Sequence, residues 1–233
     1  MKLLANNPVL RRYQRLHPSV QRRIRIAVPY FLLGISTLTA TYILFDGPDW
    51  AVWIPFAALL VLLESFAVEV NDRMLQSSSI MVVMTAGVIF ALQPGSDATF
   101  GMALMVGAGS IVPDDFKQRR WFQPMANFGQ MVLSAAAAGF LLDANLGQIE
   151  RVGTNDLLRV AVASSLAALA YATVQNMLVR KAVKTVYGND NLQPWSQMPV
   201  LFTGQVVMGL LGGLIGAAYL IADRPAEIGR AHV

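Results

Sequence analysis

Seven apolar blocks dominate this sequence, and each is close to the length that a helix needs to cross the hydrocarbon of a bilayer. About 17 to 25 apolar residues in an α-helix cover roughly 30 Å. The blocks lie at about 26–45, 51–69, 78–93, 97–113, 124–142, 157–179 and 199–222. The sequence therefore predicts an all-α integral membrane bundle of about seven transmembrane helices.

The composition also favours lipid as the solvent of this chain. Only 14% of the residues are charged and 55% are hydrophobic, whereas soluble domains contain about 25% charged residues. The basic residues collect in short segments between the apolar blocks, which membrane topology explains, so a nucleic-acid partner is not expected. The chain has no cysteine, which excludes disulfides, thiolate zinc sites and cysteine nucleophiles.

The cations are distributed unevenly between the two sides of the predicted bundle. With the N-terminus in the cytoplasm, the inner segments contain Lys2, Arg11, Arg12, Arg15, Arg22, Arg23, Arg25, Arg73, Lys117, Arg119, Arg120, Arg180, Lys181 and Lys184. The outer segments contain Arg151, Arg159, Arg224 and Arg230. The outer turns DGPDW and QPGSDA have acids and no base. This asymmetry predicts a cytoplasmic N-terminus and a multi-pass topology.

Three regions follow from this reading. Residues 1–25 form a basic cytoplasmic lead-in, residues 26–222 form the transmembrane domain, and residues 223–233 form a tail on the outer side. The last seven residues, EIGRAHV, match the translation of a widely used sequencing adapter. We therefore expect residues 227–233 not to be native; the alternative is an ordinary polar tail.

Amide side chains are the best candidates for a binding site. Asn127 and Gln130 are three residues apart, so they share one face of the fifth predicted helix. Gln175 and Asn176 on the sixth helix and Gln205 on the seventh are expected to converge with them. Amides without histidine or paired acids suit recognition of a small-molecule ligand rather than acid/base catalysis. The alternative is interhelical contact, worth about 0.6 kcal/mol each.

Glu64 is a second candidate, for ligand binding or coupling, because a carboxylate in hydrocarbon costs roughly 2.5 to 3.5 kcal/mol. Glu69 is expected on the same helix but about 140° away, so the two acids share no face. Both acids are otherwise explained by hydration at the interface or by pairing with Arg73. Asp114 and Asp115 alone are weak evidence for a cation, so no metal or cofactor is expected.

The loop KQRRWF places cations beside aromatic rings at the inner interface. Arg119, Arg120 and Trp121 are expected to anchor the chain to anionic lipid; contact with a cytoplasmic domain is the alternative. Small residues allow close helix approach, and Gly212 with Gly216 forms a GxxxG step. That step predicts helix packing within the chain and can also serve a homodimer.

From about residue 51 to 222 the chain resembles the N-terminal multi-helix membrane domain that precedes HD-GYP phosphohydrolase or GGDEF diguanylate cyclase domains in bacterial signalling proteins. The resemblance is in LLESFAVEV, then SSSIMVVMTAGVIFAL, then DDFKQRRWFQPMANFGQMVLSAAAAGFLL. The positions that match the family pattern are Glu64, Ser77 to Ser79, Arg119 to Trp121, Asn127, Gln130 and Ser134 to Gly139.

The resemblance implies a membrane-embedded signal-input domain in a bacterial inner membrane. It also implies an eighth helix and a cytoplasmic output domain that are lost here, since no HD pair, GGDEF or EAL string occurs in the 233 residues. This chain alone is therefore not expected to be an enzyme. The arrangement of short, glycine-rich helices also resembles, more distantly, the six-helix substrate-binding subunits of vitamin transporters. A small-molecule transporter or its binding subunit is thus the alternative.

Overall fold

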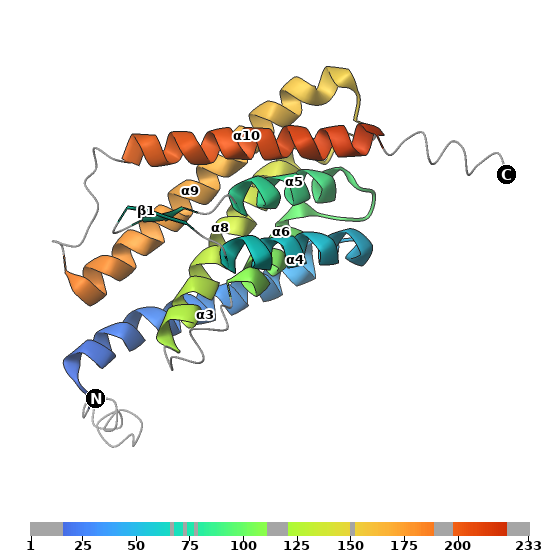
Figure 1. Cartoon of the computed structure of the whole chain (residues 1–233). Coiled ribbons are helices and arrows are strands. Elements are labelled where there is room, and N and C mark those ends of the chain that lie inside the picture. The colour runs from blue at the N-terminus through green and yellow to red at the C-terminus, as the bar shows by residue number, and fades with distance from the viewer. Residues whose placement is uncertain are drawn as a thin grey trace.

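The computed structural model describes residues 16–65, 68–71, 74–76, 79–110, 121–149, 152–188 and 198–222. These residues form seven α-helices: α3 (Pro18–Leu44), α4 (Trp50–Ser65), α5 (Ser79–Leu92), α6 (Ala98–Gly109), α8 (Phe122–Leu146), α9 (Leu157–Tyr187) and α10 (Met198–Ala222). A short antiparallel hairpin consists of β1 (Val68–Asn71) and β2 (Met74–Gln76), and one 3₁₀ turn, η1 (Thr154–Asp156), precedes α9. The helices form one bundle, in which α3, α8 and α9 run at an angle to α10 (Figure 1).

The predicted helical membrane protein is confirmed, and each predicted block contains one helix. Four helices are long and apolar enough to cross a membrane: α3, α8, η1 with α9, and α10. The remaining helices α4, α5 and α6 have 16, 14 and 12 residues. At 1.5 Å per residue they are about 24, 21 and 18 Å long, shorter than a hydrocarbon core of about 30 Å. Seven complete crossings therefore stay a prediction.

Several predicted boundaries differ from the structure, and the second block and α3 are examples. The second block was expected to be helical to residue 69, but α4 ends at Ser65 and Glu69 pairs with Leu75 in the β1–β2 hairpin. The 140° relation between Glu64 and Glu69 therefore does not apply, and the fold contains this small strand pair beside its helices. Helix α3 begins at Pro18 instead of residue 26, because a proline at the first position favours helix initiation.

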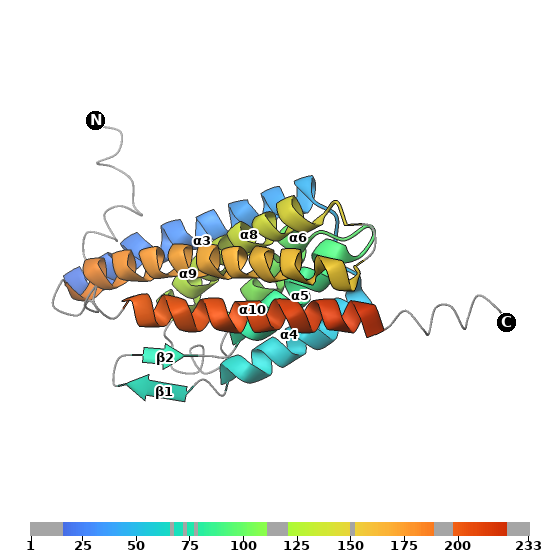
Figure 2. The same cartoon turned by 90° about the horizontal axis from the view of Figure 1, so that it is seen from above.

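Helix α5 lies at the centre of the bundle and positions the other helices. Every residue from Val82 to Leu92 is buried, as expected for a helix that is apolar on all sides. Figures 1 and 2 show α10 along one side of α5 and α4 and α6 close by. The buried hydroxyl of Thr85 donates to the carbonyl of Gly212 at 2.9 Å, so a polar contact also joins α5 to α10.

The glycines of α10 allow this close contact. A Cβ atom at Gly212 would overlap the carbonyl of Met81, and one at Gly216 would lie 2.8 Å from the carbonyl of Thr85. The predicted packing role of the GxxxG step is thus confirmed. Both glycines are buried against α5 of the same chain, and a homodimer stays a prediction.

A tight turn at Pro94 and Gly95 follows α5. Gly95 has φ +72°, a left-handed conformation that favours glycine, and the N–H of Ser96 donates to the carbonyl of Gln93 at 3.3 Å. The turn reverses the chain between α5 and α6.

Charge separates the two ends of the bundle. The start of α3 and the end of α9 lie together (Figure 2), and we call this the basic end because it contains Arg22, Arg23, Arg25, Arg180, Lys181 and Lys184. The opposite end, the acidic end, contains Asp46, Asp49, Asp97, Asp143 and Asp156. Within the described ranges, Arg159 is the exception among the cations.

Large apolar side chains cover the outside of the long helices. On α3 they include Leu32, Leu33, Ile35 and Ile43, and on α10 they include Val207, Leu211, Ile215 and Tyr219. Such continuous apolar exposure is rare on a soluble protein. These faces are the surface that four helices of membrane-spanning length would present to lipid.

Candidate functional site

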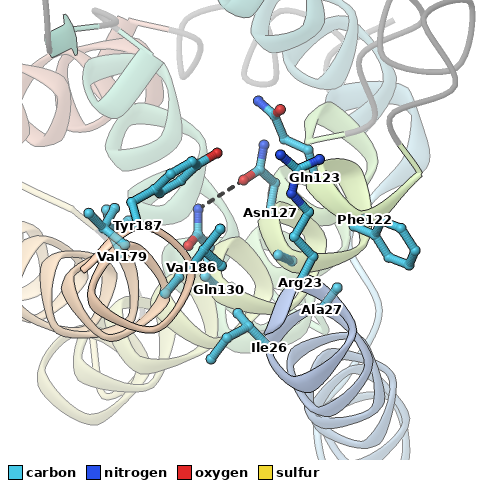
Figure 3. Close-up of a pocket in the computed structure, with 13 residues that line it drawn as sticks. Arg23, Ile26, Ala27, Phe122, Gln123, Asn127, Gln130, Val179, Val186 and Tyr187 are labelled. Carbon is cyan, nitrogen blue, oxygen red and sulfur yellow. Dashed lines mark hydrogen bonds between the residues drawn. The ribbon is translucent and has the colours of Figure 1, made fainter. Parts of the chain in front are cut away.

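A pocket of about 740 Å³ lies between the start of α3, the start of α8 and the end of α9, at the basic end (Figure 3). Ligand pockets typically measure about 300–1,000 Å³, so this one is large enough for a small molecule. Its polar lining consists of Arg23, Gln123, Asn127, Gln130 and Tyr187. Its apolar lining consists of Ile26, Ala27, Phe122, Ala126, Val179, Ala182, Val183 and Val186.

The pocket exists because α3 is pinned to its two neighbours just beyond it. A Cβ atom at Gly129 would overlap the carbonyl of Tyr30, so α3 and α8 touch backbone to backbone there. The hydroxyl of Tyr30 donates to the carbonyl of Leu178 at 2.9 Å and joins α3 to α9. Towards the basic end the lining residues Ala27 and Ala126 are too small to fill the space between the helices.

Two of the predicted amides meet in this pocket. The Nε2 group of Gln130 donates to Oδ1 of Asn127 at 3.3 Å (Figure 3), as their spacing of three residues on α8 predicts. This bond leaves the side-chain N–H groups of Asn127 for another acceptor. Gln123 and Arg23 add further N–H donors at the same pocket. Among the residues that the structure describes, the lining contains no carboxylate and no histidine, which suits hydrogen-bonded recognition and not acid/base chemistry.

The other three predicted amides lie elsewhere. Gln175 donates from Nε2 to the sulfur of Met131 at 3.5 Å, and Asn176 donates to the carbonyl of Ala172 on its own helix at 2.7 Å. Gln205 is on α10, and its buried Oε1 has no hydrogen-bond partner. None of the three lines the pocket, so the expected convergence of all five amides on it was wrong. α8 provides both of the predicted amides found there.

Glu64 lies in the last turn of α4 and is partly buried. On α9, the hydroxyl of Tyr171 donates to the sulfur of Met131 at 3.4 Å. Glu64 does not line the pocket between α3, α8 and α9.

The predicted interface anchor is only partly within the described residues. Trp121 precedes the first turn of α8 at the basic end and is 54% exposed, a position typical of an interfacial aromatic ring. Arg119 and Arg120 lie outside the described residues. Across the described ranges, no group of three or more His, Cys, Asp or Glu residues is placed to hold a metal ion.

Asp143 is a functional position that the sequence analysis missed. Its carboxylate accepts from the backbone N–H groups of Ala98 at 2.8 Å and Thr99 at 2.9 Å, and from the Thr99 hydroxyl at 2.5 Å. These bonds cap α6 from a different helix. Asp97, the residue that precedes α6, instead accepts from the N–H of Asp46 at 2.7 Å. In the sequence, Asp143 is an acid that directly follows an apolar block. The same pattern is typical of a loop residue, so it does not indicate a helix cap.

The fold, with four helices long and apolar enough to cross a membrane, indicates a helical membrane protein with a pocket at its basic end. No family model, curated protein or solved structure matches this chain.

Proposed function

We propose that this chain is a membrane-embedded signal-input domain that binds a small ligand at its basic end and regulates a cytoplasmic output domain. The pocket between α3, α8 and α9 is the observation that carries the proposal. Its described lining offers guanidinium and amide N–H donors that can select a ligand, with no carboxylate or histidine among these residues. The resemblance to domains that precede HD-GYP or GGDEF modules supplies the kind of output.

The basic end is placed on the cytoplasmic side of a bacterial inner membrane. Cations are retained on the cytoplasmic side of membrane proteins, and six of the described cations, Arg22, Arg23, Arg25, Arg180, Lys181 and Lys184, gather at this end. The pocket then faces the compartment in which cyclic dinucleotides are made and degraded. Trp121, with Arg119 and Arg120 before it in sequence, anchors the same end to anionic lipid.

Signal input requires that occupancy of the pocket changes the packing of the bundle. Helices α3 and α9 are the elements that can transmit such a change, because each runs from the pocket to the acidic end. Beside the pocket, the hydroxyl of Tyr30 links α3 to α9 by donating to the carbonyl of Leu178. A ligand that separates α3 from α9 would therefore alter the distance between these helices along their length.

Spin labelling tests this coupling, and the absence of native cysteines makes each introduced pair unique. One pair, Val28→Cys with Lys184→Cys, reports on the pocket; the other, Leu44→Cys with Leu158→Cys, reports on the acidic end. All four positions are exposed. Ala182→Trp fills the pocket from α9 and substitutes for a ligand. Leu166→Trp, on the exposed side of α9, is the matched control.

We expect Ala182→Trp to shift both distance distributions, with a helix displacement of about 1–2 Å at the acidic end. Leu166→Trp should shift neither. A change confined to the pocket pair would describe a passive binding site and would refute signal transmission through α3 and α9.

A transporter or its substrate-binding subunit is the second candidate, and the short helices α4, α5 and α6 favour it. Transporters often build their sites from helices that do not cross the whole membrane. The genomic DNA downstream of the Pro225 codon separates the two functions. A further apolar span followed by an HD or GGDEF motif supports signal input, whereas a stop codon in genuine sequence favours the transporter.

A further inference from the structure

The pocket between α3, α8 and α9 has two chemically different walls. On one side Arg23, Gln123 and Asn127 provide a guanidinium group and amide N–H groups (Figure 3). The wall on α9 is apolar and contains Val179, Ala182, Val183 and Val186. A ligand that satisfies both walls has an acceptor-rich head and an apolar chain.

The charge around the pocket selects the sign of that head. Of the described lining residues, Arg23 is the one with a charge, and none is a carboxylate. Arg22 and Arg25 on α3, with Lys184 on α9, lie at the same end of the bundle, so the local potential is positive. A guanidinium group binds phosphate through two parallel N–H bonds, and the neighbouring amides add further donors.

We infer that the pocket binds the phosphate of an anionic phospholipid, with Arg23, Gln123 and Asn127 at the phosphate and the first part of an acyl chain along the apolar wall of α9. This inference rests on the proposed function, because it names the ligand class of the same pocket. A phospholipid is favoured over a soluble phosphate ester because α3 and α9 both continue from the pocket into exposed apolar faces. Lipid can reach the pocket along these faces.

Binding of short-chain phosphatidylglycerol to the whole chain in phosphatidylcholine nanodiscs tests the assignment. We expect saturable binding of one lipid per chain. Arg23→Gln should weaken it by roughly tenfold or more, the loss typical of a charge-assisted hydrogen-bonded contact. The matched control is Arg22→Gln, which removes the same charge from the adjacent, exposed position outside the pocket. It should change the affinity by no more than about threefold, as an exposed charge does.

Two competitors identify the source of the phosphate. Short-chain phosphatidylcholine should compete poorly, because its choline adds a cation beside Arg23. Inorganic phosphate should compete only weakly, because it lacks the chain. If inorganic phosphate displaces the lipid at comparable concentration, the site takes a soluble phosphate and the phospholipid assignment is overturned.

Ala182→Trp gives an independent reading of the apolar wall. It should abolish lipid binding while leaving the protein folded. A narrow distance distribution for the spin-label pair at the acidic end would verify that the variant is folded. Equal losses for Arg22→Gln and Arg23→Gln, or binding that never saturates, would refute a built site and indicate general surface charge. These results bear only on the ligand class, whereas the paired distance measurement with Ala182→Trp bears on signal input.

Discussion

Asp143 offers the sharpest test of how the polar groups in this bundle are used. Its carboxylate caps α6 by accepting from two backbone N–H groups and one hydroxyl, all on Ala98 and Thr99. Gly139, one turn earlier on α8, lets α8 approach the start of α6, because a Cβ atom there would lie 2.6 Å from Cα of Thr99. The cap and the helix crossing therefore form one contact.

Asp143→Ala should destabilise the fold by about 2–4 kcal/mol. Loss of a helix cap costs about 1 kcal/mol, and each partly buried donor that is left without an acceptor costs about 1–3 kcal/mol. The expected loss is smaller than the sum of these costs, because water can reach this end of the bundle and hydrogen-bond to the donors that lose Asp143. Asp143→Asn keeps an acceptor oxygen but loses the charge, so it should cost about half as much.

Thermal unfolding in detergent, followed by circular dichroism, measures the effect. A loss of 2–4 kcal/mol corresponds to a decrease in Tm on the order of 5–10 °C for a chain of this size. The control is Asp49→Ala, which removes an exposed acceptor for the N–H of Ala51 at the start of α4. If Asp143→Ala lowers Tm no more than Asp49→Ala, the inter-helix cap does not stabilise the fold as argued.

Two further substitutions test the packing and the isolated amide. Gly129→Ala should destabilise the fold by about 3 kcal/mol, because its Cβ would overlap the backbone carbonyl of Tyr30 and a backbone cannot move away as a side chain can. The control is Gly47→Ala, which has no neighbour within 4 Å and should change Tm very little. Equal effects of the two substitutions would contradict the close crossing of α3 and α8. Gln205→Leu removes a buried oxygen without a partner and should raise stability by about 1 kcal/mol in the same assay, whereas a clear loss would show that Gln205 has an important contact.

The helices could be predicted from the sequence because their apolar blocks are bounded by strong local signals. Helix α9 ends before Gly188, which has φ +94°, and the α5–α6 turn depends on Gly95. The centre of the bundle also follows from composition, since α5 has no charged residue on any side. Boundaries failed where a helix continued past its apolar part, as in α3, whose first turns contain Arg22 and Arg23.

The site could be predicted only in part, because it depends on contacts between helices far apart in sequence. The Asn127 to Gln130 bond lies within one helix, so spacing alone predicted it. Arg23 lines the pocket only because the start of α3 lies beside the start of α8, and no local sequence pattern predicts that contact. Gln175 and Asn176 failed as predicted partners of that pair because Met131 and the backbone of α9 use their N–H groups instead.

The orientation of the chain does not depend on whether the three short helices each cross the membrane. Helix α3 ends at the acidic end and α8 begins at the basic end, so α4, α5 and α6 together must return the chain from one end to the other. Helices α8, α9 and α10 then alternate in direction. The charge asymmetry therefore predicts which end lies in the cytoplasm even though α5 and α6 are too short to span the hydrocarbon alone.

Cysteine accessibility tests this assignment directly, because the chain has no cysteine of its own. Asn155→Cys lies in η1 at the acidic end and Lys184→Cys lies near the end of α9 at the basic end, and both positions are exposed. In intact cells a membrane-impermeant maleimide should label Asn155→Cys, whereas Lys184→Cys should react only after the membrane is opened. The reverse pattern would place the pocket outside the cytoplasm, and an output domain on the cytoplasmic side could then not share a compartment with the ligand.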